Sequence, residues 1–586
     1  MVVRREEGTA SLEPTAILDL DLFGHLELTD PVAVYRASSL EQVRPVLRAA
    51  EAAAAAGRWV AGHVAYEAAP VFDPALRVRP GGRGPFAWFA AFDGPGEATP
   101  REPSEASLEG LEPDIDERGF TGAVEAARDA IGWGVAYQVN LSLRLRGRFS
   151  GSPATLYRRL HAAQGGRQGA FLAMGRRALA SASPELFFER DGDRIRVRPM
   201  KGTAPRGRFP EEDQRMAAAL SASEKERAEN VMITDLMRND LGRIARVGTV
   251  RVDALCDVER YRTVHQMTST VEARLRPGTT LDEVFAALFP CGSVTGAPKA
   301  SAMDLIARLE RSPRGPYCGA VGAIAPDGRA AFNVAIRTVD LDLATGEAVY
   351  GAGAGITWAS RARAEWREVL AKTRVLEVPD LAGLELIETL RVEDGACALL
   401  PRHLSRLESS ARHLGFVHDA RAIEAAVRDR LTALGPGSRR LRVLLDEGGA
   451  VRFDAAPVPP PAPGPLPVAL APTPVSSRDP LRFHKTTRRQ PLELRRRERP
   501  GVFDVLLQNE AGELTELTIG NLVAELDGAR VTPPRECGLL PGVFRAELLA
   551  RGEVSERVLR MEDLRRAPRL WLVNAVRGWV PIRLVE

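Results

Sequence analysis

Five lysines stand out in this chain of 586 residues, because every other basic side chain among its 80 lysines and arginines is an arginine. An arginine keeps its proton at any useful pH, whereas a lysine can lose its proton and act as a nucleophile or a base. Lys225, in Glu-Lys-Glu-Arg, is predicted to be a solvated helix charge. Lys201, Lys299, Lys372 and Lys485 lie in motif-like segments and are candidates for chemistry, although Lys299 is equally well explained as a charge at a turn.

Two pairs of glutamates are spaced three residues apart, which places both carboxylates of a pair on one face of a helix. Glu226 and Glu229 form the first pair, and Glu365 and Glu368 form the second. If the two helices face each other, the four carboxylates form an oxygen-rich site suited to Mg²⁺. Taken alone, either pair is more typical of a solvated helix surface.

Composition and charge are those of an ordinary globular protein. Hydrophobic residues make up 45% and charged residues 27% of the chain, and the formal net charge of +3 gives no single-sign field for nucleic acid binding. The five cysteines are widely scattered without a Cys-x-x-Cys pair, and no apolar stretch is long enough to span a bilayer. We therefore expect a cytoplasmic protein without nucleic-acid or membrane partners.

Up to about residue 375, short strand-like runs alternate with amphipathic helices and loops rich in glycine and proline. The mixture lacks regular βαβ spacing and predicts a large α+β domain over residues 1–377. Strands are expected at 59–64, 137–145, 185–188, 194–197 and 348–352, and helices at 40–56, 121–131, 211–246, 281–288, 299–309 and 360–376.

The pattern restarts in residues 378–586. A strand is expected at 384–392 and a helix at 402–414. A proline-rich tract at 456–467 reads as an extended connector. It divides this second domain into two subdomains, at about 381–457 and 468–586.

An ordered series of motifs surrounds the candidate residues of the first domain. Ser-Pro-Glu ends at Glu185, Met-Lys-Gly-Thr contains Lys201, and Glu-Asn begins at Glu229. The series continues with Asp-Leu-Met-Arg-Asn-Asp at 235–240, Val-His at 264–265, Pro-Cys-Gly-Ser-Val-Thr-Gly-Ala-Pro-Lys at 290–299, Ile-Arg at 336–337, Gly-Ala-Gly-Ala-Gly-Ile at 351–356 and Glu-Trp-Arg-Glu at 365–368. From about residue 15 to 376 the chain resembles the chorismate-utilising enzymes, a group that includes the component I subunits of anthranilate synthase and aminodeoxychorismate synthase, and the isochorismate and salicylate synthases.

The resemblance implies a large α+β sandwich that binds chorismate and magnesium. Glu185 is the implied general acid, Lys201 the implied nucleophile, and His265 a residue that orients the substrate. The implied magnesium ligands are Glu229 and Glu368 directly, and Glu226 and Glu365 through water. The implied substrate contacts are Gln138, Thr295, Gly296, Tyr317, Arg337, Gly353, Gly355 and Lys372.

Two positions discriminate among these enzymes. Members that add water to chorismate have a lysine base where this chain has Gln138, and because a glutamine cannot deprotonate water, ammonia is the implied nucleophile. Anthranilate synthases have a segment similar to Pro-Ile-Ala-Gly-Thr where this chain has Met-Lys-Gly-Thr, whereas aminodeoxychorismate synthases have a lysine at the position of Lys201. The resemblance therefore implies amination at C4. No cysteine lies on a Gly-x-Cys-x-Gly elbow, so we expect free ammonia or a separate glutamine amidotransferase subunit.

A second series of motifs begins near residue 381 and resembles class IV pyridoxal-phosphate enzymes, the group of branched-chain aminotransferases and aminodeoxychorismate lyases. The motifs are Glu-Thr-Leu-Arg at 388–391, His-Leu-Ser-Arg-Leu at 403–407, His-Lys-Thr-Thr at 484–487, Leu-Thr-Glu at 514–516, Gly-Asn-Leu at 520–522, Gly-Leu-Leu-Pro-Gly-Val-Phe-Arg at 538–545 and Asn-Ala-Val-Arg-Gly at 574–578. Lys485 is the implied cofactor lysine, and Glu516 the implied partner of the pyridinium nitrogen. The implied phosphate ligands are Arg406 and backbone amides at Gly542, Val543 and Ala575.

Together the two resemblances predict conversion of chorismate through 4-amino-4-deoxychorismate to 4-aminobenzoate, a folate precursor. Two alternatives remain open at this point: an anthranilate-forming or secondary-metabolite enzyme with a transaminase behind it, and a non-catalytic scaffold. Class IV enzymes are usually dimers, which implies a homodimer through the C-terminal domain.

Overall fold

The computed structural model describes residues 12–82, 84–96, 105–376, 383–460 and 464–585. The chain forms two compact units. The first consists of residues 1–205 and 216–380, and the second of residues 206–215 and 381–586. A ten-residue segment from the first half of the sequence therefore belongs to the second unit.

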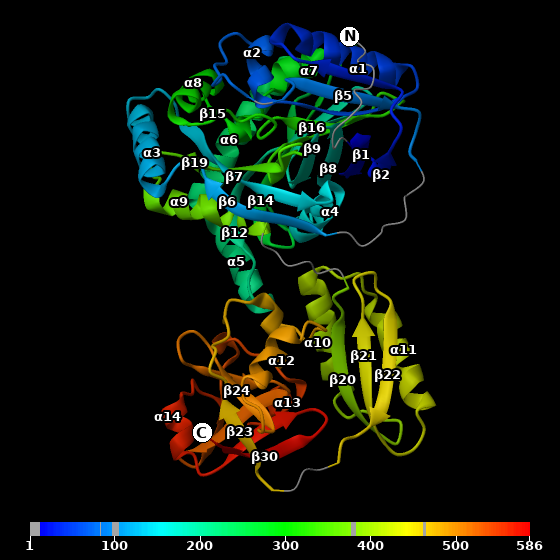
Figure 1. Ribbon diagram of the computed structural model, residues 1–586, viewed down its shortest axis with the longest axis vertical. Coiled ribbons are helices and arrows are strands. Elements are labelled where there is room, and N and C mark those ends of the chain that lie inside the picture. Colours follow the sequence, from blue (N-terminus) through cyan, green and yellow to red (C-terminus); the bar gives the residue numbers. More distant parts are fainter. Residues whose placement is uncertain (1–11, 83, 97–104, 377–382, 461–463, 586) are drawn as a thin grey trace. The chain divides into compact units, whose positions relative to one another are not determined.

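Two antiparallel sheets form the frame of the first unit (Figure 1). In spatial order, the first sheet contains β15 (Gly296–Ala297), β7 (Gln138–Gly151), β19 (Glu347–Ile356), β18 (Thr338–Asp342), β9 (Arg177–Ser183), β8 (Gln168–Gly175), β1 (Leu12–Leu20) and β2 (Gly24–Leu28), with β6 (Ala106–Pro113) paired to β7. The second contains β12 (Met200–Pro205), β14 (Val264–Arg274), β11 (Arg194–Arg198), β10 (Leu186–Asp191), β17 (Ala330–Val334), β16 (Ala320–Ile324), β4 (Trp59–Val64), β5 (Ala87–Phe92) and β3 (Ala33–Ala37), with β13 (Arg251–Arg260) paired to β14.

The two sheets pack face to face over an apolar layer. Leu18 and Leu172 of the first sheet and Trp88 and Val321 of the second belong to this core. Because side chains of a strand alternate between faces, each sheet has a second apolar face, which helices cover. Helices α1 and α7 pack on the second sheet, and α3, α4, α8 and α9 on the first. The expected α+β sandwich is confirmed.

Local sequence signals explain most of these elements. The helices expected at 281–288 and 299–309 and the strand expected at 59–64 are confirmed. The single helix expected at 211–246 is wrong, because Ser223 ends one helix and caps the next by accepting a hydrogen bond from the Glu226 backbone N–H at 3.4 Å. The helices are α1 (Val43–Ala55), α2 (Ala69–Phe72), α3 (Glu117–Gly132), α4 (Pro153–Gln164), α5 (Pro210–Ala222), α6 (Glu224–Gly242), α7 (Leu281–Leu288), α8 (Lys299–Leu309) and α9 (Ala362–Ala371).

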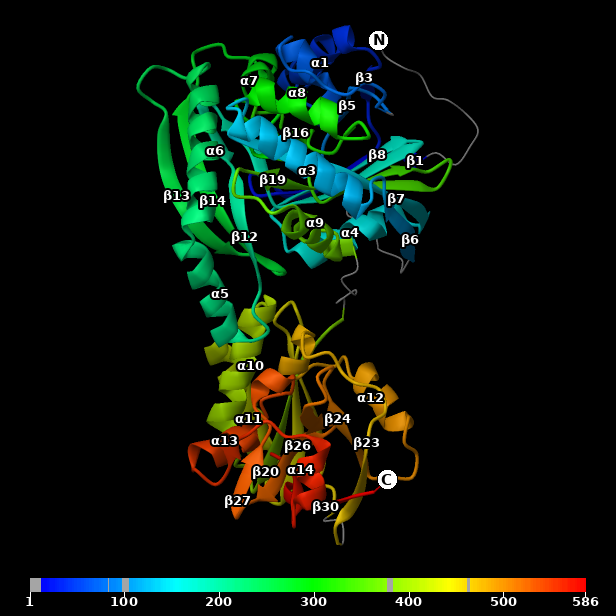
Figure 2. The same ribbon diagram turned by 90° about the vertical axis from the view of Figure 1, so that its left-hand side faces the viewer.

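Helix α6 lies along β12, β13 and β14 (Figure 2). This packing sets the first glutamate pair of α6 beside the strand that carries Lys201. No helix among the described residues is both long and apolar enough to cross a membrane.

The second unit contains two sheets. The first consists of β20 (Leu386–Glu393), β21 (Ser438–Leu445) and β22 (Val451–Pro457), packed against α10 (Leu400–Leu414) and α11 (Ala420–Ala433). The other follows the order β25 (Leu514–Leu517), β24 (Asp504–Gln508), β23 (Leu466–Leu470), β30 (Gly578–Leu584), β29 (Leu570–Asn574), β26 (Gly520–Leu526), β27 (Ala529–Thr532) and β28 (Ser555–Glu556). Strand β25 also pairs with β26, so six strands close into a ring. The remaining helices are α12 (Gln490–Arg497), α13 (Val543–Ala550) and α14 (Met561–Arg566).

Candidate functional site

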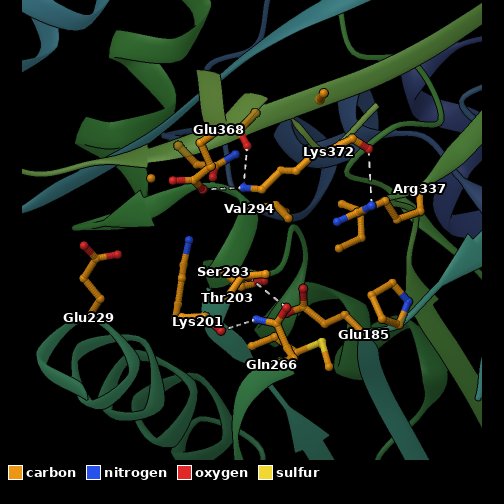
Figure 3. A pocket seen from close by; sticks show the side chains of 18 of the residues that line it. Glu185, Lys201, Thr203, Glu229, Gln266, Ser293, Val294, Arg337, Glu368 and Lys372 are labelled. Carbon is orange, nitrogen blue, oxygen red and sulfur yellow. Dashed lines mark hydrogen bonds and ion pairs between the residues drawn. The ribbon is translucent and has the colours of Figure 1, made fainter. Parts of the chain in front are cut away.

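One pocket in the first unit collects side chains from segments that lie far apart in the sequence (Figure 3). Strand β12, helices α6 and α9, strand β19 and the loop before β18 all contribute to it. The predicted residues that line this pocket are Glu185, Lys201, Glu226, Glu229, Tyr317, Arg337, Gly353, Gly355, Glu365, Glu368 and Lys372.

Lys201 projects from β12 into the pocket, with Glu229 on one side and Glu185 on the other (Figure 3). Its backbone carbonyl accepts a hydrogen bond from Asn230 Nδ2 at 3.2 Å, which ties the strand to α6. Burial lowers the pKa of the Lys201 ammonium; the Glu229 carboxylate raises it and Lys372 lowers it, and the net shift is downward. A lowered pKa increases the amine fraction, which is the form that attacks carbon.

Glu185 is buried, with 2% of its surface exposed. Burial raises the pKa of its carboxyl to about 7, against the opposing effects of a hydrogen bond with Ser293 and the Lys201 charge. Cys291 Sγ lies 4.0 Å from Glu185 Oε1 and belongs to the same buried wall. A carboxyl with this pKa still holds a proton near neutral pH, as a general acid requires.

Both predicted glutamate pairs line this one pocket, Glu226 and Glu229 from α6, and Glu365 and Glu368 from α9. Burial raises the pKa of Glu226, Glu229 and Glu365. Burial has the same effect on Glu368, but the adjacent Lys372 ammonium outweighs it and lowers the pKa. The repulsion among these carboxylates favours a cation in the pocket.

The neighbours of the four glutamates bear on the implied magnesium site. Within the described ranges, no group of three or more His, Cys, Asp or Glu side chains is arranged to hold a metal ion. Ammonium groups lie beside the carboxylates instead, since Lys225 Nζ is 3.8 Å from Glu229 Oε1 and Lys372 Nζ is 2.8 Å from Glu368 Oε1. The donors nevertheless fit a hard cation, because they are all carboxylates and Glu229 Oε1 is buried with no hydrogen-bond partner in the described part of the chain. The four glutamates would hold Mg²⁺, which would orient an anionic substrate.

Cationic and phenolic groups lie on the far side of the pocket. Arg337 has a φ of 52°, a left-handed conformation that is rare for a non-glycine residue, and its Nη1 donates to the Lys372 carbonyl at 3.2 Å. Lys372 Nζ donates in turn to the Gly353 carbonyl at 2.8 Å. Tyr317 packs so closely on Gly351 that a Cβ there would lie 2.3 Å from its ring. The backbone thus fixes these groups where a carboxylate could bind.

Gln138 lies directly behind the pocket wall. Its Nε2 donates to Glu229 Oε2 at 3.4 Å, and it is fully buried. A Cβ at Gly355 would lie 2.5 Å from Gln138 Nε2 and 3.3 Å from Lys201 Nζ. Glycine at this position therefore leaves room for both nitrogen atoms.

Besides Gln138, three predicted residues are buried without lining the pocket. Thr295 donates its hydroxyl to the Cys291 carbonyl at 3.1 Å, and Gly296 pairs with β7 through β15. His265 precedes Gln266 on β14, and it is Gln266 that lines the pocket and donates to a β12 carbonyl at 2.8 Å. His265 itself is buried and is not among the lining residues, and its orienting role stays a prediction.

The structure also changes the interpretation of two lysines. Lys225 lines the pocket and was not expected there. Lys299 lies outside it and forms a 2.8 Å ion pair with Asp240. No sequence signal distinguished Gln266 or Lys225 as pocket residues.

A second group of charged residues surrounds Lys485 in the second unit. Lys485 lies in an extended segment before α12, and its carbonyl accepts a hydrogen bond from the Ile387 backbone N–H at 2.8 Å. Burial lowers the pKa of its ammonium to about 8, and the Arg406 charge acts in the same direction. Glu516 is also near enough to interact with this ammonium, so the structure brings these three predicted residues together.

Arg406 is held by a buried carboxylate. Its Nε and Nη2 donate to the two oxygens of Glu388 at 2.8 and 2.7 Å, and its Nη1 donates to the Pro541 carbonyl at 3.2 Å. His403 Nδ1 lies 2.6 Å from the same carboxylate. Burial opposes ionisation of Glu388, but Arg406 and His403 outweigh it and lower the pKa to about 2. Glu388 was given no role from the sequence, although it fixes the guanidinium.

Glu516 and the Gly542 loop complete this group. Burial raises the pKa of Glu516 to about 7, and the carboxylate accepts hydrogen bonds from Arg482 Nη2 and the Leu540 backbone N–H, each at 3.2 Å. A Cβ at Gly542 would lie 2.1 Å from Asn521 Oδ1, so any larger residue would require the Asn521 side chain to move. Val543 begins α13 immediately after Gly542, and Ala575 follows β29. A partly buried amine of lowered pKa, a glycine beside the Asn521 side chain and a helix N-terminus fit an aldehyde cofactor with a phosphate group.

Comparison with known proteins identifies two families. Residues 90–377 match the family of chorismate binding enzymes, and residues 385–585 match amino-transferase class IV. Anthranilate synthase component 1 of Streptomyces coelicolor is 42% identical over 275 residues, which are 47% of this chain and 53% of that protein. Aminodeoxychorismate synthase component 1 of Salmonella typhimurium is 41% identical over 239 residues, which are 41% of this chain and 52% of that protein.

The fold comparison agrees for the first domain. The crystal structure of anthranilate synthase component I from Streptococcus pneumoniae matches with a TM-score of 0.53 and 26% identity, over 64% of this chain and 94% of that one. The chain spans about half the length of the curated relatives it matches.

Proposed function

Because the chain joins a domain of the chorismate binding enzyme family to a domain of the class IV amino-transferase family, we propose that it converts chorismate to 4-aminobenzoate in two steps. The first domain aminates chorismate at C4 with ammonia. The second eliminates pyruvate from the resulting 4-amino-4-deoxychorismate. The product is a folate precursor, which assigns both steps to folate synthesis.

Lys201 is the observation that carries the proposal for the first domain. It is a partly buried lysine of lowered pKa that points into a pocket lined by carboxylates. Gln138, which would be a lysine base in a water-adding enzyme, donates an amide hydrogen bond to Glu229. A lysine at position 201 and a glutamine at position 138 together favour ammonia as the nucleophile and C4 as its target.

The first reaction would proceed through a covalent bond to Lys201. Glu185 protonates the C4 hydroxyl, the Lys201 amine forms a bond to C2, both ring double bonds shift toward C4, and water leaves from C4. Ammonia then forms a bond to C4 and gives a proton to Glu185, while both double bonds shift back and the C2–nitrogen bond breaks. Lys201 and Glu185 return to their starting states, and the net change is replacement of hydroxyl by amine.

The second reaction would use the residues around Lys485. Arg406 and the backbone amides at Gly542 and Val543 would bind the phosphate of pyridoxal phosphate, and Glu516 would face the ring nitrogen. The bound cofactor supplies an electron sink that makes the C4 proton acidic. With a pKa of about 8, Lys485 can accept this proton near neutral pH and release it again as pyruvate departs and the ring becomes aromatic.

Two further proposals concern partners and location. The chain has no cysteine on a Gly-x-Cys-x-Gly elbow, which favours ammonia from a separate glutamine amidotransferase subunit. All five cysteines are free, in keeping with a reducing cytoplasm. Class IV enzymes are usually dimers, which favours a homodimer through the class IV domain. Sedimentation of the protein as a monomer would refute this.

The test is incubation of the purified protein with chorismate, Mg²⁺, pyridoxal phosphate and ammonium salt at alkaline pH, with chromatographic identification of the product. We expect 4-aminobenzoate and pyruvate in equal amounts. Lys201→Ala should form neither, and Lys485→Ala should accumulate 4-amino-4-deoxychorismate. The two variants therefore test the two domains separately.

A second candidate is an anthranilate-forming enzyme joined to a transaminase, since relatives with both names match at nearly the same identity. Anthranilate as the product would refute the interpretation of Lys201. Accumulated 4-amino-4-deoxychorismate with the unaltered protein would uphold the first domain and favour a transaminase or a degenerate domain behind it.

A further inference from the structure

Lys225 occupies an unexpected position among the four pocket glutamates. It is the second residue of α6, and its Nζ lies 3.8 Å from Glu229 Oε1 and 3.9 Å from Glu226 Oε1. Both distances are those of an ion pair, beyond hydrogen-bonding range. Its ammonium also interacts favourably with the carboxylates of Glu365 and Glu368 on α9. One lysine therefore serves as a counter-ion to both helices.

The other two pocket lysines are fixed by different contacts. Lys372 donates to the Gly353 carbonyl at 2.8 Å and pairs with Glu368 at 2.8 Å. Lys201 lies on β12, where it is partly buried and its ammonium interacts with Glu229 and Glu185. The side chain of Lys225, in contrast, is 49% exposed, so it can move into solvent without a change in the backbone. A compact ammonium on a four-carbon chain suits such a movement.

We propose that Lys225 is a built-in counter-ion that holds the four glutamates together in the metal-free protein and is displaced when a divalent cation binds. The proposal rests on the proposed function, because it takes these glutamates as the metal ligands. Four carboxylates around one pocket repel each other and need a positive charge nearby. An ammonium supplies one charge at ion-pair distance, whereas Mg²⁺ supplies two and takes oxygen ligands directly.

Displacement lowers metal affinity, because the ion pairs of Lys225 must be broken before the metal binds. Loss of two partly exposed ion pairs corresponds to a change in affinity of roughly three- to thirtyfold. Lys225→Met is therefore expected to bind the metal more tightly than the natural protein by this factor. The same variant should be less stable without metal, since its glutamates have lost a counter-ion. A conventional supporting residue would give the opposite result, weaker metal binding on removal.

The experiment measures binding of Mn²⁺ alone, followed by electron paramagnetic resonance of the free ion at low ionic strength, without chorismate or ammonia. Mn²⁺ takes the same carboxylate oxygen ligands as Mg²⁺. Lys225→Arg keeps the charge and should keep the low affinity. Arg227→Met removes one charge from an exposed position two residues away on the same helix and should leave the affinity unchanged. The difference in Mn²⁺ affinity between Lys225→Met and the natural protein should decrease as salt is added, because salt screens the ion pairs of Lys225.

A second readout is thermal unfolding with and without Mn²⁺. We expect the midpoint of Lys225→Met to be lower than that of the natural protein without metal and to rise more on metal addition. The inference would be overturned if Lys225→Met bound Mn²⁺ no more tightly than the natural protein. It would also be overturned if Arg227→Met gained as much Mn²⁺ affinity as Lys225→Met, or if no form bound Mn²⁺. Because no substrate is present, failure to form 4-aminobenzoate would refute the proposed function without deciding this result.

Discussion

Replacement of Glu185 by glutamine is expected to stabilise the first unit at alkaline pH while it abolishes amination. Burial raises the pKa of this carboxyl from 4.5 to about 7, so between these values the folded protein holds a proton that the unfolded chain has released. Stability therefore falls as pH rises through this interval, since the folded state binds more protons than the unfolded state. Because the pKa is about 7 in the folded protein instead of 4.5, ionisation of Glu185 lowers the free energy of unfolding by about 3 kcal/mol at pH 8. Glutamine has nearly the same shape and no charge to bury.

The assay is urea unfolding of the natural protein and Glu185→Gln at pH 5 and pH 8, with the transition of the first unit identified by its shift on addition of chorismate. We expect the variant to be more stable by about 3 kcal/mol at pH 8 and by less than about 1 kcal/mol at pH 5. A difference that is independent of pH, or a variant that is less stable at pH 8, would refute the reasoning.

Glu272, which is also buried, provides a control in which the Glu→Gln substitution should have the opposite effect on stability. Burial favours its neutral form, but hydrogen bonds from Arg194, Arg196 and Arg251 outweigh burial and lower its pKa. The stability that this carboxylate contributes is present above its unfolded pKa and is lost as pH falls through the folded pKa. Glu272→Gln should therefore destabilise the protein, and more at pH 8 than at low pH.

Three further predictions concern the two reactions. Lys201→Arg keeps the positive charge but not the nucleophile, and should lower the rate of 4-amino-4-deoxychorismate formation by at least about 10³-fold in the same chromatographic assay; a rate within tenfold of the natural protein would exclude a covalent role. Chelation of divalent cations should stop the reaction from chorismate and leave the release of pyruvate from supplied 4-amino-4-deoxychorismate unchanged, as followed with a coupled dehydrogenase; loss of both activities would contradict separate sites. Lys485→Ala should lose the absorbance that the natural protein shows with pyridoxal phosphate at roughly 410 to 430 nm and should release no pyruvate, and retention of both would assign the cofactor to another lysine.

Sequence periodicity was sufficient for elements whose signals are local. Helix α7 begins at a capping box in which Thr280 and Glu283 bond each other's backbone N–H groups, and its bounds follow from the sequence. Periodicity failed at 211–246, where it predicted one helix instead of two. Ser223 has a helical pattern on both sides, so the sequence does not distinguish it from a serine inside a helix. Only the structure shows that its hydroxyl accepts the Glu226 N–H and caps a new helix.

Placement of side chains relative to the pocket depends on pairing between distant strands. His265 and Gln266 are neighbours in sequence, and only the pairing of β14 with β12 decides that Gln266 faces the pocket. Lys225 illustrates the same limit, since a lysine at the start of a helix is usually solvated. It lies among carboxylates here because α9, more than a hundred residues later, brings the second glutamate pair to the same pocket.

The sequence by itself determined which candidate groups the chain carries: Lys201, Glu185, two glutamate pairs at helical spacing and Lys485, all of which depend on residue type and order. Tertiary structure alone decided the state in which those groups are held. Burial raises the pKa of Glu185 to about 7 and lowers that of Lys485 to about 8. These values depend on how much water each group loses and on which charges lie within a few ångströms, and both are set by segments that meet only when the chain folds.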